Sequence, residues 1–262
     1  MLTPADQVAA SPLRQLSGVA ELLKACGGDL HVRAEADPQR VESTWQHAGG
    51  SYGWVIPSRR TEGRAHLTTY GPGPATTALL VALDALPGSN LGSVTLPRDA
   101  DRHLPTTYSL SPRNDWEWFV TLTPPPAQPG EDQVDWLPDE AAGEIADLLQ
   151  AWSPRHDADP GGPGVLRWCG ARDRTGRLVA TAAHTQRVPG VPYLASIATA
   201  GDVRGQGYGA AVTAWITRAI LAEGTGWVTL GMYSDNDVAR RLYLRLGFRC
   251  DHRFTSGALV RR

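Results

Sequence analysis

Lysine is almost absent from this chain of 262 residues. Lys24 is the only lysine, so the remaining positively charged side chains are arginines. Contacts to a phosphate or a carboxylate must therefore come from arginine or from backbone N–H groups. The formal net charge is only −2. The sequence thus lacks the basic surface that binds nucleic acids or anionic membranes, and we expect neither as a partner.

Cysteines and long apolar runs are also scarce. The three cysteines, Cys26, Cys169 and Cys250, have no metal-ligand spacing, so we expect reduced thiols and no metal site. No stretch approaches the ~18–20 apolar residues of a membrane span. The start of the chain, Met1–Asp6, does not resemble a secretion signal. These absences predict a globular, cytoplasmic protein.

The first half of the chain alternates between helix and strand patterns. Apolar residues at helical spacing predict helices over residues 13–26 and 37–47, and a third between Pro74 and Pro87. Strands are predicted over Tyr52–Ile56, Ala65–Thr69, Leu91–Leu96 and Asp115–Thr123, with a polar turn at 58–63 between the first two.

Three consecutive prolines in Pro124–Gly130 mark a linker. We therefore expect a first domain over 1–123, a linker over 124–132 and a second domain over 133–262. In the second domain, helices are predicted over Asp139–Trp152, after the glycine-rich turn that follows Thr199, and after the capping segment Ser234–Asp237. The predicted strands are Val165–Ala171, Leu178–Thr185, Tyr193–Thr199, Trp227–Tyr233 and a last one from Phe248. Few residues follow Phe248, and the strand over 116–123 would complete this sheet.

The most informative stretch joins the strand 193–199 to the helix after it and reads Arg204-Gly-Gln-Gly-Tyr-Gly209. Glycines let a ligand approach the backbone, the first N–H groups of a helix have no partner within it, and the helix dipole favours an anion there. Arg204 adds a positive charge. The stretch therefore predicts a phosphate site, although a glycine turn alone is also consistent with a flexible connection.

A second motif follows at the distance that one strand and a return helix require. Its residues are Asn236, Ala239, Leu242, Tyr243, Gly247 and Phe248. With Arg204, Gly207 and Gly209, they resemble the acyl-CoA signature and the following segment of the GNAT superfamily of N-acetyltransferases. The resemblance covers about residues 133–262. It implies an α/β (α+β) fold in which helices flank a mixed central sheet.

The resemblance also implies roles for individual residues, with acetyl-CoA or another acyl-CoA as co-substrate and no metal. Backbone groups of the strand would pair with the pantetheine arm: Ile197, Ala198 and Thr199. The pyrophosphate would bind Arg204 and the amides of the turn: Gly205, Gln206, Gly207, Tyr208, Gly209 and Ala210. Asn236, with Ala239 and Leu242 on its helix, would hold the pantetheine from the other side. Tyr243 would protonate the leaving thiolate as the general acid; the alternative is an aromatic side chain that packs on the sheet.

The general base is not defined by the motifs. Some members of the superfamily use a glutamate on the strand before the signature, but residues 191–199 contain no carboxylate. Tyr193 or Ser196 could relay a proton through water, and His184 on the neighbouring strand titrates near neutral pH. His156 and Asp157 fall where the superfamily usually shapes the acceptor pocket.

The element order of the first half matches that of the second, so residues 1–123 are predicted to be a degenerate GNAT-like copy. Pro72 and Pro74 lack N–H groups where donors would have to face a phosphate, which disables the corresponding turn. Two-domain members with such a degenerate copy are known in the superfamily.

The predicted activity is transfer of an acetyl group from acetyl-CoA to a primary amine of a small molecule or peptide. No cysteine lies in the two motifs, so we expect direct transfer in a ternary complex. One alternative is a longer acyl group, delivered by CoA or by a carrier protein, in an apolar tunnel beside Ile197 and Tyr243. Another is an acyl-CoA sensor without turnover. The protein is expected to be a monomer or a homodimer.

Overall fold

The structure is a computed structural model that describes residues 12–58 and 62–262; Met1–Asp6 and the middle of the expected turn at 58–63 lie outside this range. The chain forms two compact units. Unit 1 holds the residues up to Trp116 together with Arg253–Arg262, and unit 2 holds Glu117–His252. The units divide the chain inside the strand expected over 115–123, whereas the sequence analysis placed the division in the proline-rich segment that follows.

The sheet of unit 1 has the strand order β1-β2-β3-β4-β5-β13, and the short strand β6 pairs with β13. Its strands are β1 (Leu13–Leu16), β2 (Ser43–His47), β3 (Ser51–Pro57), β4 (Ala65–Tyr70), β5 (Leu91–Pro97), β6 (Tyr108–Leu110) and β13 (Arg249–Arg261, of which 253–261 belong to unit 1). β4 and β5 are parallel and pair at four positions, from Ala65↔Leu91 to Thr68↔Thr95.

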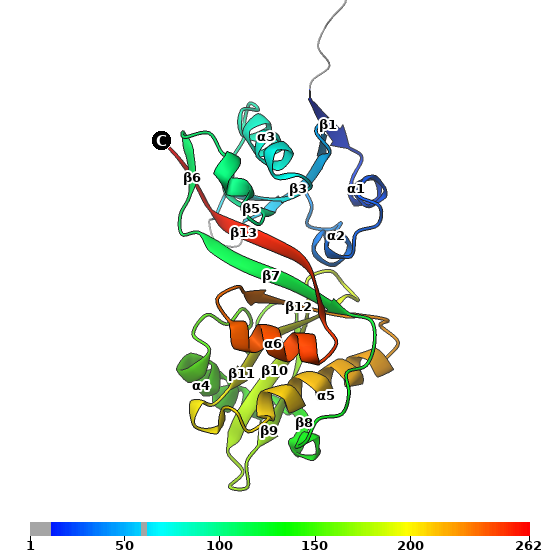
Figure 1. Cartoon of the computed structure of the whole chain (residues 1–262), viewed down its shortest axis with the longest axis vertical. Helices are drawn as coiled ribbons and strands as arrows, with labels where there is room; N and C mark the ends of the chain where they lie inside the picture. The colour runs from blue at the N-terminus through cyan, green and yellow to red at the C-terminus, as the bar shows by residue number, and fades with distance from the viewer. Residues whose placement is uncertain (1–11, 59–61) are drawn as a thin grey trace, which may run out of the picture. The chain divides into compact units, whose positions relative to one another are not determined.

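Helices cover both faces of this sheet (Figure 1). α1 (Val19–Ala25) and α2 (Leu30–Glu35) pack over Trp54, whereas α3 (Gly73–Asp84) packs over the neighbouring residue Val55. Successive strand residues point to opposite faces, which explains why the two helical layers use alternate positions of β3. A short 3₁₀ turn, η1 (Ala100–His103), follows β5.

Of the predicted helices of unit 1, the first is right over Val19–Ala25 but starts too early, and the second is wrong over 43–47. Residues 13–16 form β1, which pairs with β2 from Leu13↔His47 to Leu16↔Thr44, and the helix begins only at Val19. Residues 43–47 form β2 and not a helix; the helix of this region, α2, ends before them and is capped by Asp29. In both places strand pairing overrides a weak helical spacing of apolar residues.

The sheet of unit 2 has the strand order β7-β12-β11-β10-β9-β8. Its strands are β7 (Asn114–Thr121, of which 117–121 belong to unit 2), β8 (Val134–Leu137), β9 (Val165–Arg172), β10 (Leu178–Gln186), β11 (Pro192–Thr199) and β12 (Val228–Tyr233). β11 and β12 are parallel, whereas β8 to β11 form antiparallel pairs. As expected, the strand that begins at Asn114 extends this sheet beside β12.

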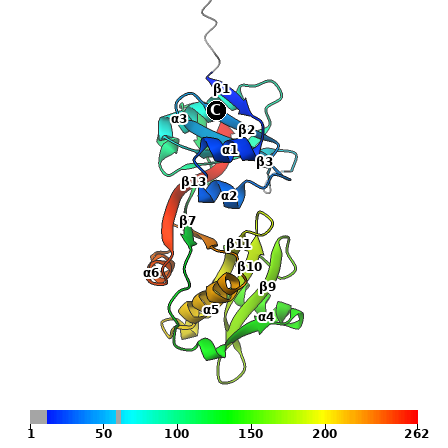
Figure 2. The same cartoon turned by 90° about the vertical axis from the view of Figure 1, so that its right-hand side faces the viewer.

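The helices of unit 2 lie on opposite faces of its sheet (Figure 2). α4 (Ala142–Trp152) follows the 3₁₀ turns η2 (Glu131–Gln133) and η3 (Asp139–Ala141) and covers one face. α5 (Tyr208–Ala222) and α6 (Asp237–Arg245) share a core with the other face, in which Leu194, Val212 and Leu230 are buried. No helix among the described residues is long and apolar enough to cross a membrane.

Candidate functional site

The two parallel strands at the centre of unit 2 separate partway along their length. Among the described residues, β11 and β12 pair only at Tyr193↔Thr229 and Leu194↔Leu230, and both strands run on past these positions. Beyond them, the edge of β11 that faces β12 has no strand partner in the described structure. Its backbone N–H and C=O groups are therefore available to an extended ligand that joins the sheet as a strand.

Ser196 forms a bulge in β11. Its φ is 50°, and the register between β10 and β11 shifts beside it. In a regular strand, residues three positions apart point to opposite faces. Here Leu194 lies in the core under α5 and Ile197 packs against the same core, because the extra residue reverses the alternation between them. The Ser196 hydroxyl donates to the Ala158 carbonyl at 2.8 Å and accepts from the Ala158 N–H at 2.9 Å. This contact fixes the loop after α4 to β11 and occupies the hydroxyl considered above as a proton relay.

A glycine-rich turn connects β11 to α5. It starts with the 3₁₀ turn η4 (Gly201–Val203) and ends at Gly207, the N-cap of α5, whose φ of 96° lies in the left-handed region. A side chain in that region costs ~1–2 kcal/mol. A Cβ placed on Gly207 would meet nothing within 4 Å, so the space beside it is open. The first N–H groups of α5 have no partner within the helix, and this end of the dipole attracts anions.

The helix α5 lies close to β11 at this corner. A Cβ on Gly209 would come within 3.0 Å of Thr199 Oγ1, so glycine permits the close approach. Arg204 stands beside the turn; its Nη2 donates to the Trp152 carbonyl at 3.3 Å and its guanidinium lies 5.8 Å from the centre of the Trp152 ring. Arg204 is exposed and held by one long hydrogen bond, which leaves it able to pair with a bound anion.

The structure therefore brings the predicted cofactor residues of β11 and the turn together at one corner of unit 2. They form a continuous path from the separated strands to the start of α5: Ile197, Ala198, Thr199, Arg204, Gly205, Gln206, Gly207, Tyr208, Gly209 and Ala210.

The helix α6 carries the second motif. Asn236 is its N-cap, and the side-chain Oδ1 accepts from the Ala239 N–H at 3.0 Å. This bond uses the carbonyl side of the amide, so the Nδ2 group is the part that could donate to a ligand. Ala239 and Leu242 are partly buried against the core of unit 2.

Tyr243 is buried in the same core, with 6% of its surface exposed. Its ring meets Phe119 edge-on at a centroid distance of 5.9 Å and lies 6.1 Å from Phe248. Burial raises the pKa of Tyr243 above its usual range, and the nearby Tyr193 raises it further. The phenol is thus protonated at physiological pH and can donate a hydrogen bond, but it is a weaker acid than a solvated tyrosine.

His184 lies away from the glycine turn, at the other end of α5. It is buried, and Arg167 Nε donates to its Nδ1 at 3.4 Å while Arg167 also pairs with Glu223 just past the helix. Burial, and then the charge of Arg167, lowers the pKa of His184 to about 4. The imidazole is therefore neutral at pH 7 and only a weak base, which does not favour it for the proton-accepting step.

Tyr193 lies at the last paired positions of β11, where the strands separate. The Arg187 guanidinium stacks 4.3 Å from the centre of its ring and pairs with Asp157, one of the residues expected near the acceptor. The other, His156, has Nδ1 2.8 Å from the Ser153 carbonyl and Nε2 2.8 Å from Asp159 Oδ1, so the loop itself holds its ring.

The loop after α4 also contacts the end of β12, a contact without a signature in the sequence. Arg155 pairs with Asp235 at 2.9 Å and stacks on Tyr233 at 4.3 Å, whereas Ala158 is bound to Ser196 of β11. Residues 155–158 therefore cross from β12 to β11 on the α4 side of the sheet. No local sequence pattern predicts these contacts, because the residues that make them lie about 40 to 80 positions apart in the chain.

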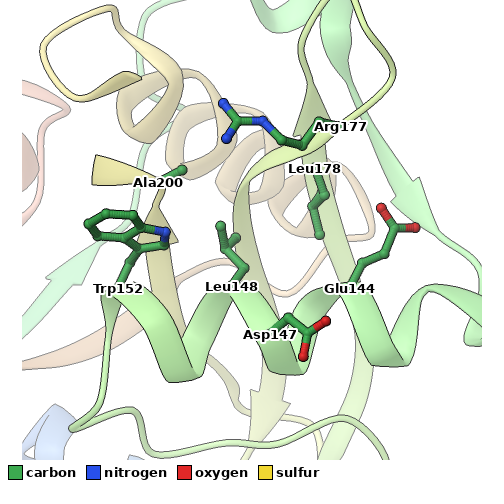
Figure 3. Close-up of a pocket in the computed structure, with 7 residues that line it drawn as sticks. All are labelled: Glu144, Asp147, Leu148, Trp152, Arg177, Leu178 and Ala200. Atoms are coloured by element: carbon green, nitrogen blue, oxygen red, sulfur yellow. The ribbon is translucent and has the colours of Figure 1, made fainter. Parts of the chain in front are cut away.

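A separate hollow of about 280 Å³ lies between α4 and the neighbouring strands (Figure 3). It is lined by Glu144, Asp147, Leu148, Trp152, Arg177, Leu178 and Ala200. None of the predicted cofactor or catalytic residues lines it, although Trp152, the partner of Arg204, does.

The fold is that of the GNAT superfamily, as the sequence predicted, and helices flank a mixed sheet in each unit. Residues 169–255, which include the glycine turn and the whole second motif, match the family model described as FR47-like protein. No curated protein matches the sequence.

Three solved structures illustrate the similarity over almost the whole chain. A GCN5-related N-acetyltransferase from Kribbella flavida is 23% identical, with a TM-score of 0.51, and the match covers 93% of this chain and 96% of that one. One from Sphaerobacter thermophilus is 17% identical, with a TM-score of 0.55 and coverage of 92% and 85%. A tandem GNAT protein from the clavulanic acid biosynthesis pathway is 16% identical, with a TM-score of 0.52 and coverage of 95% and 98%. At these identities the similarity shows the fold.

Proposed function

We propose that unit 2 is an N-acetyltransferase that moves an acetyl group from acetyl-CoA directly to a primary amine. The observation that carries this proposal is the separation of β11 and β12 next to the open N-terminus of α5. A ligand that is extended at one end and carries phosphates at the other fits such a site. Acyl-CoA has this form, and it supplies an acyl group activated as a thioester.

The residues at the corner fit this co-substrate. The unpaired edge of β11 at Ile197–Thr199 offers backbone groups to the amides of the pantetheine arm. The N–H groups at the start of α5, with Arg204, offer donors to the pyrophosphate. Asn236 offers its Nδ2 group from the side of α6.

Tyr243 would act on the leaving sulfur. In the transfer, the amine nitrogen forms a bond to the acyl carbon, the carbon–sulfur bond breaks, and the thiolate must be stabilised or protonated. Because the phenol is protonated at neutral pH and burial makes it a weaker acid, its first contribution is a hydrogen bond to the sulfur. Tyr193 is the proposed relay that passes the amine proton to water, since it lies where the strands separate, whereas burial and the charge of Arg167 lower the pKa of His184 to about 4.

Unit 1 is proposed to be a degenerate copy that binds no acyl-CoA. Its parallel strands β4 and β5 stay paired from Ala65↔Leu91 to Thr68↔Thr95, so they leave no gap like that between β11 and β12. The helix α3 begins after Pro72, which has no N–H, and Pro74 removes another donor from its first turn.

The proposed function is tested by release of free CoA thiol from acetyl-CoA with a panel of primary amines. We expect amine-dependent release that falls at least about tenfold in Tyr243→Phe, because the phenol acts only on the leaving group, with unchanged affinity for acetyl-CoA. Turnover only with longer acyl-CoA or acyl-carrier donors would replace the acetyl assignment. Tight acetyl-CoA binding without turnover on any amine would indicate a sensor and overturn the proposal.

A further inference from the structure

We infer that the strand β7, which neighbours β12 in the sheet, positions Tyr243 for the reaction through two contacts that it makes to α6. Glu117 and Phe119, two residues apart on β7, point to the same side of the strand. Glu117 forms a bidentate ion pair with Arg240, and Phe119 packs edge-on against Tyr243. This inference rests on the proposed function and adds residues that neither motif contains.

The Glu117–Arg240 pair is well formed and largely buried. Arg240 Nε donates to Glu117 Oε2 at 2.9 Å and Nη2 donates to Oε1 at 3.0 Å, while the Glu117 side chain is only 3% exposed. Such a planar, bidentate contact fixes orientation as well as distance. Glu117→Gln removes this contact and leaves Arg240 with Asp237 as a charged partner on its own helix, so the orientation of α6 against β7 is no longer fixed.

Arg240 also connects the start of α6 to the end of β12. Its Nη2 donates to the Ser234 carbonyl at 2.8 Å, and its Nη1 contacts Asp237 Oδ1 at 2.5 Å. The same guanidinium therefore holds β7, the turn after β12 and the first turn of α6. Asn236, the proposed pantetheine contact, lies within this turn.

Arg240 and Tyr243 are three residues apart on α6 and so lie on neighbouring positions of one helix face. A shift of Arg240 away from β7 would carry Tyr243 with it, because both residues belong to the same short helix, and would loosen the contact of Tyr243 with Phe119. The proposed hydrogen bond to the leaving sulfur depends on distance and direction. A displacement of about 1 Å can cost about 100-fold in rate when it misaligns reacting groups.

The test is a double-mutant cycle of Glu117→Gln and Tyr243→Phe in the full chain, with acetyl-CoA and the best amine of the panel. Glu117→Gln should lower kcat about tenfold or more, within the range expected for misalignment, and leave the KM for acetyl-CoA almost unchanged. In the Tyr243→Phe background the same change should lower kcat less than about twofold, because contributions that act through one group are not additive. Arg240→Lys, which keeps the charge at a more exposed position, repeats the test if Glu117→Gln does not fold.

Hydrogen exchange provides a readout that does not require activity. Glu117→Gln should speed amide exchange over residues 237–245 and leave residues 208–222 unchanged. Glu144→Gln is the control for losing a bidentate pair of the same geometry elsewhere in unit 2, since Glu144 pairs with Arg172 at 2.7 and 2.8 Å between α4 and β9, at an exposed position. It should change neither exchange in α6 nor kcat.

Equal losses of kcat in the two backgrounds, or unchanged exchange over 237–245, would overturn the inference. Absence of turnover in the wild-type protein would overturn the proposed function and, with it, the role of Glu117 in the reaction. The exchange result separates these failures, because it shows whether Glu117 orders α6 whatever the activity.

Discussion

Replacing Gly207 by alanine should weaken acetyl-CoA binding much more than it weakens the fold. Gly207 has a φ of 96°, where an alanine costs ~1–2 kcal/mol. The added methyl group would also stand in the open space beside the first N–H groups of α5. If the methyl group prevents even one hydrogen bond from these N–H groups to a phosphate, the binding free energy falls by ~1.5–3 kcal/mol. At 1.4 kcal/mol for each factor of ten, Kd should rise about 10- to 150-fold.

Gly224, at the other end of α5, provides the matched control. Its φ is 84°, and a Cβ placed there would also meet nothing within 4 Å. Gly224→Ala should therefore cost similar unfolding free energy while leaving Kd unchanged. Calorimetric titration with acetyl-CoA and denaturant unfolding measure the two quantities for both variants. Wild-type affinity in Gly207→Ala, or equal weakening in both variants, would refute a phosphate site at Gly207.

Two further predictions concern protonation and stoichiometry. The pKa of His184 is lowered to about 4 in the folded state, so the unfolded chain binds the extra proton first as the pH falls below about 6.5. Stability should therefore drop by about 2 kcal/mol between pH 7 and pH 5 on account of this residue. Denaturant unfolding at the two pH values should show a smaller drop in His184→Gln, and an equal drop would contradict the assigned environment. Calorimetry should also give one acetyl-CoA per chain, because β4 and β5 are paired where β11 and β12 separate; two per chain would show that unit 1 binds it too.

Much of unit 2 could be predicted from the sequence because its signals are local. The glycine-rich turn and the capping segment Ser234–Asp237 predict helix starts from local residues, and α5 and α6 begin within these segments, at Tyr208 and Asp237. The predicted order of strands from Val165 to Tyr233 is confirmed for the same reason: each strand is bounded by turn residues.

Other features depend on partners that are distant in the chain. Leu13–Leu16 form a strand only because His47 and its neighbours pair with them, a relation that helical spacing does not reveal. Glu117 meets Arg240 across 123 residues, and no motif contains both. The pKa of His184 depends on Arg167 and on burial, neither of which could be assigned before the sheet was known. The motifs therefore pointed to a tyrosine and an anion site but did not reveal the residues that hold them in place.

The bulge at Ser196 also determines how β11 can be altered. Deleting one residue there would restore simple alternation, so Ile197 and Thr199 would turn away from α5 while Tyr193 kept its direction. Thr199 would then no longer lie under Gly209, and the start of α5 would lose its support. In any redesign of the acyl-binding edge, the face to which a side chain points must be assigned separately before and after Ser196, because the alternation of faces along the strand reverses at this residue.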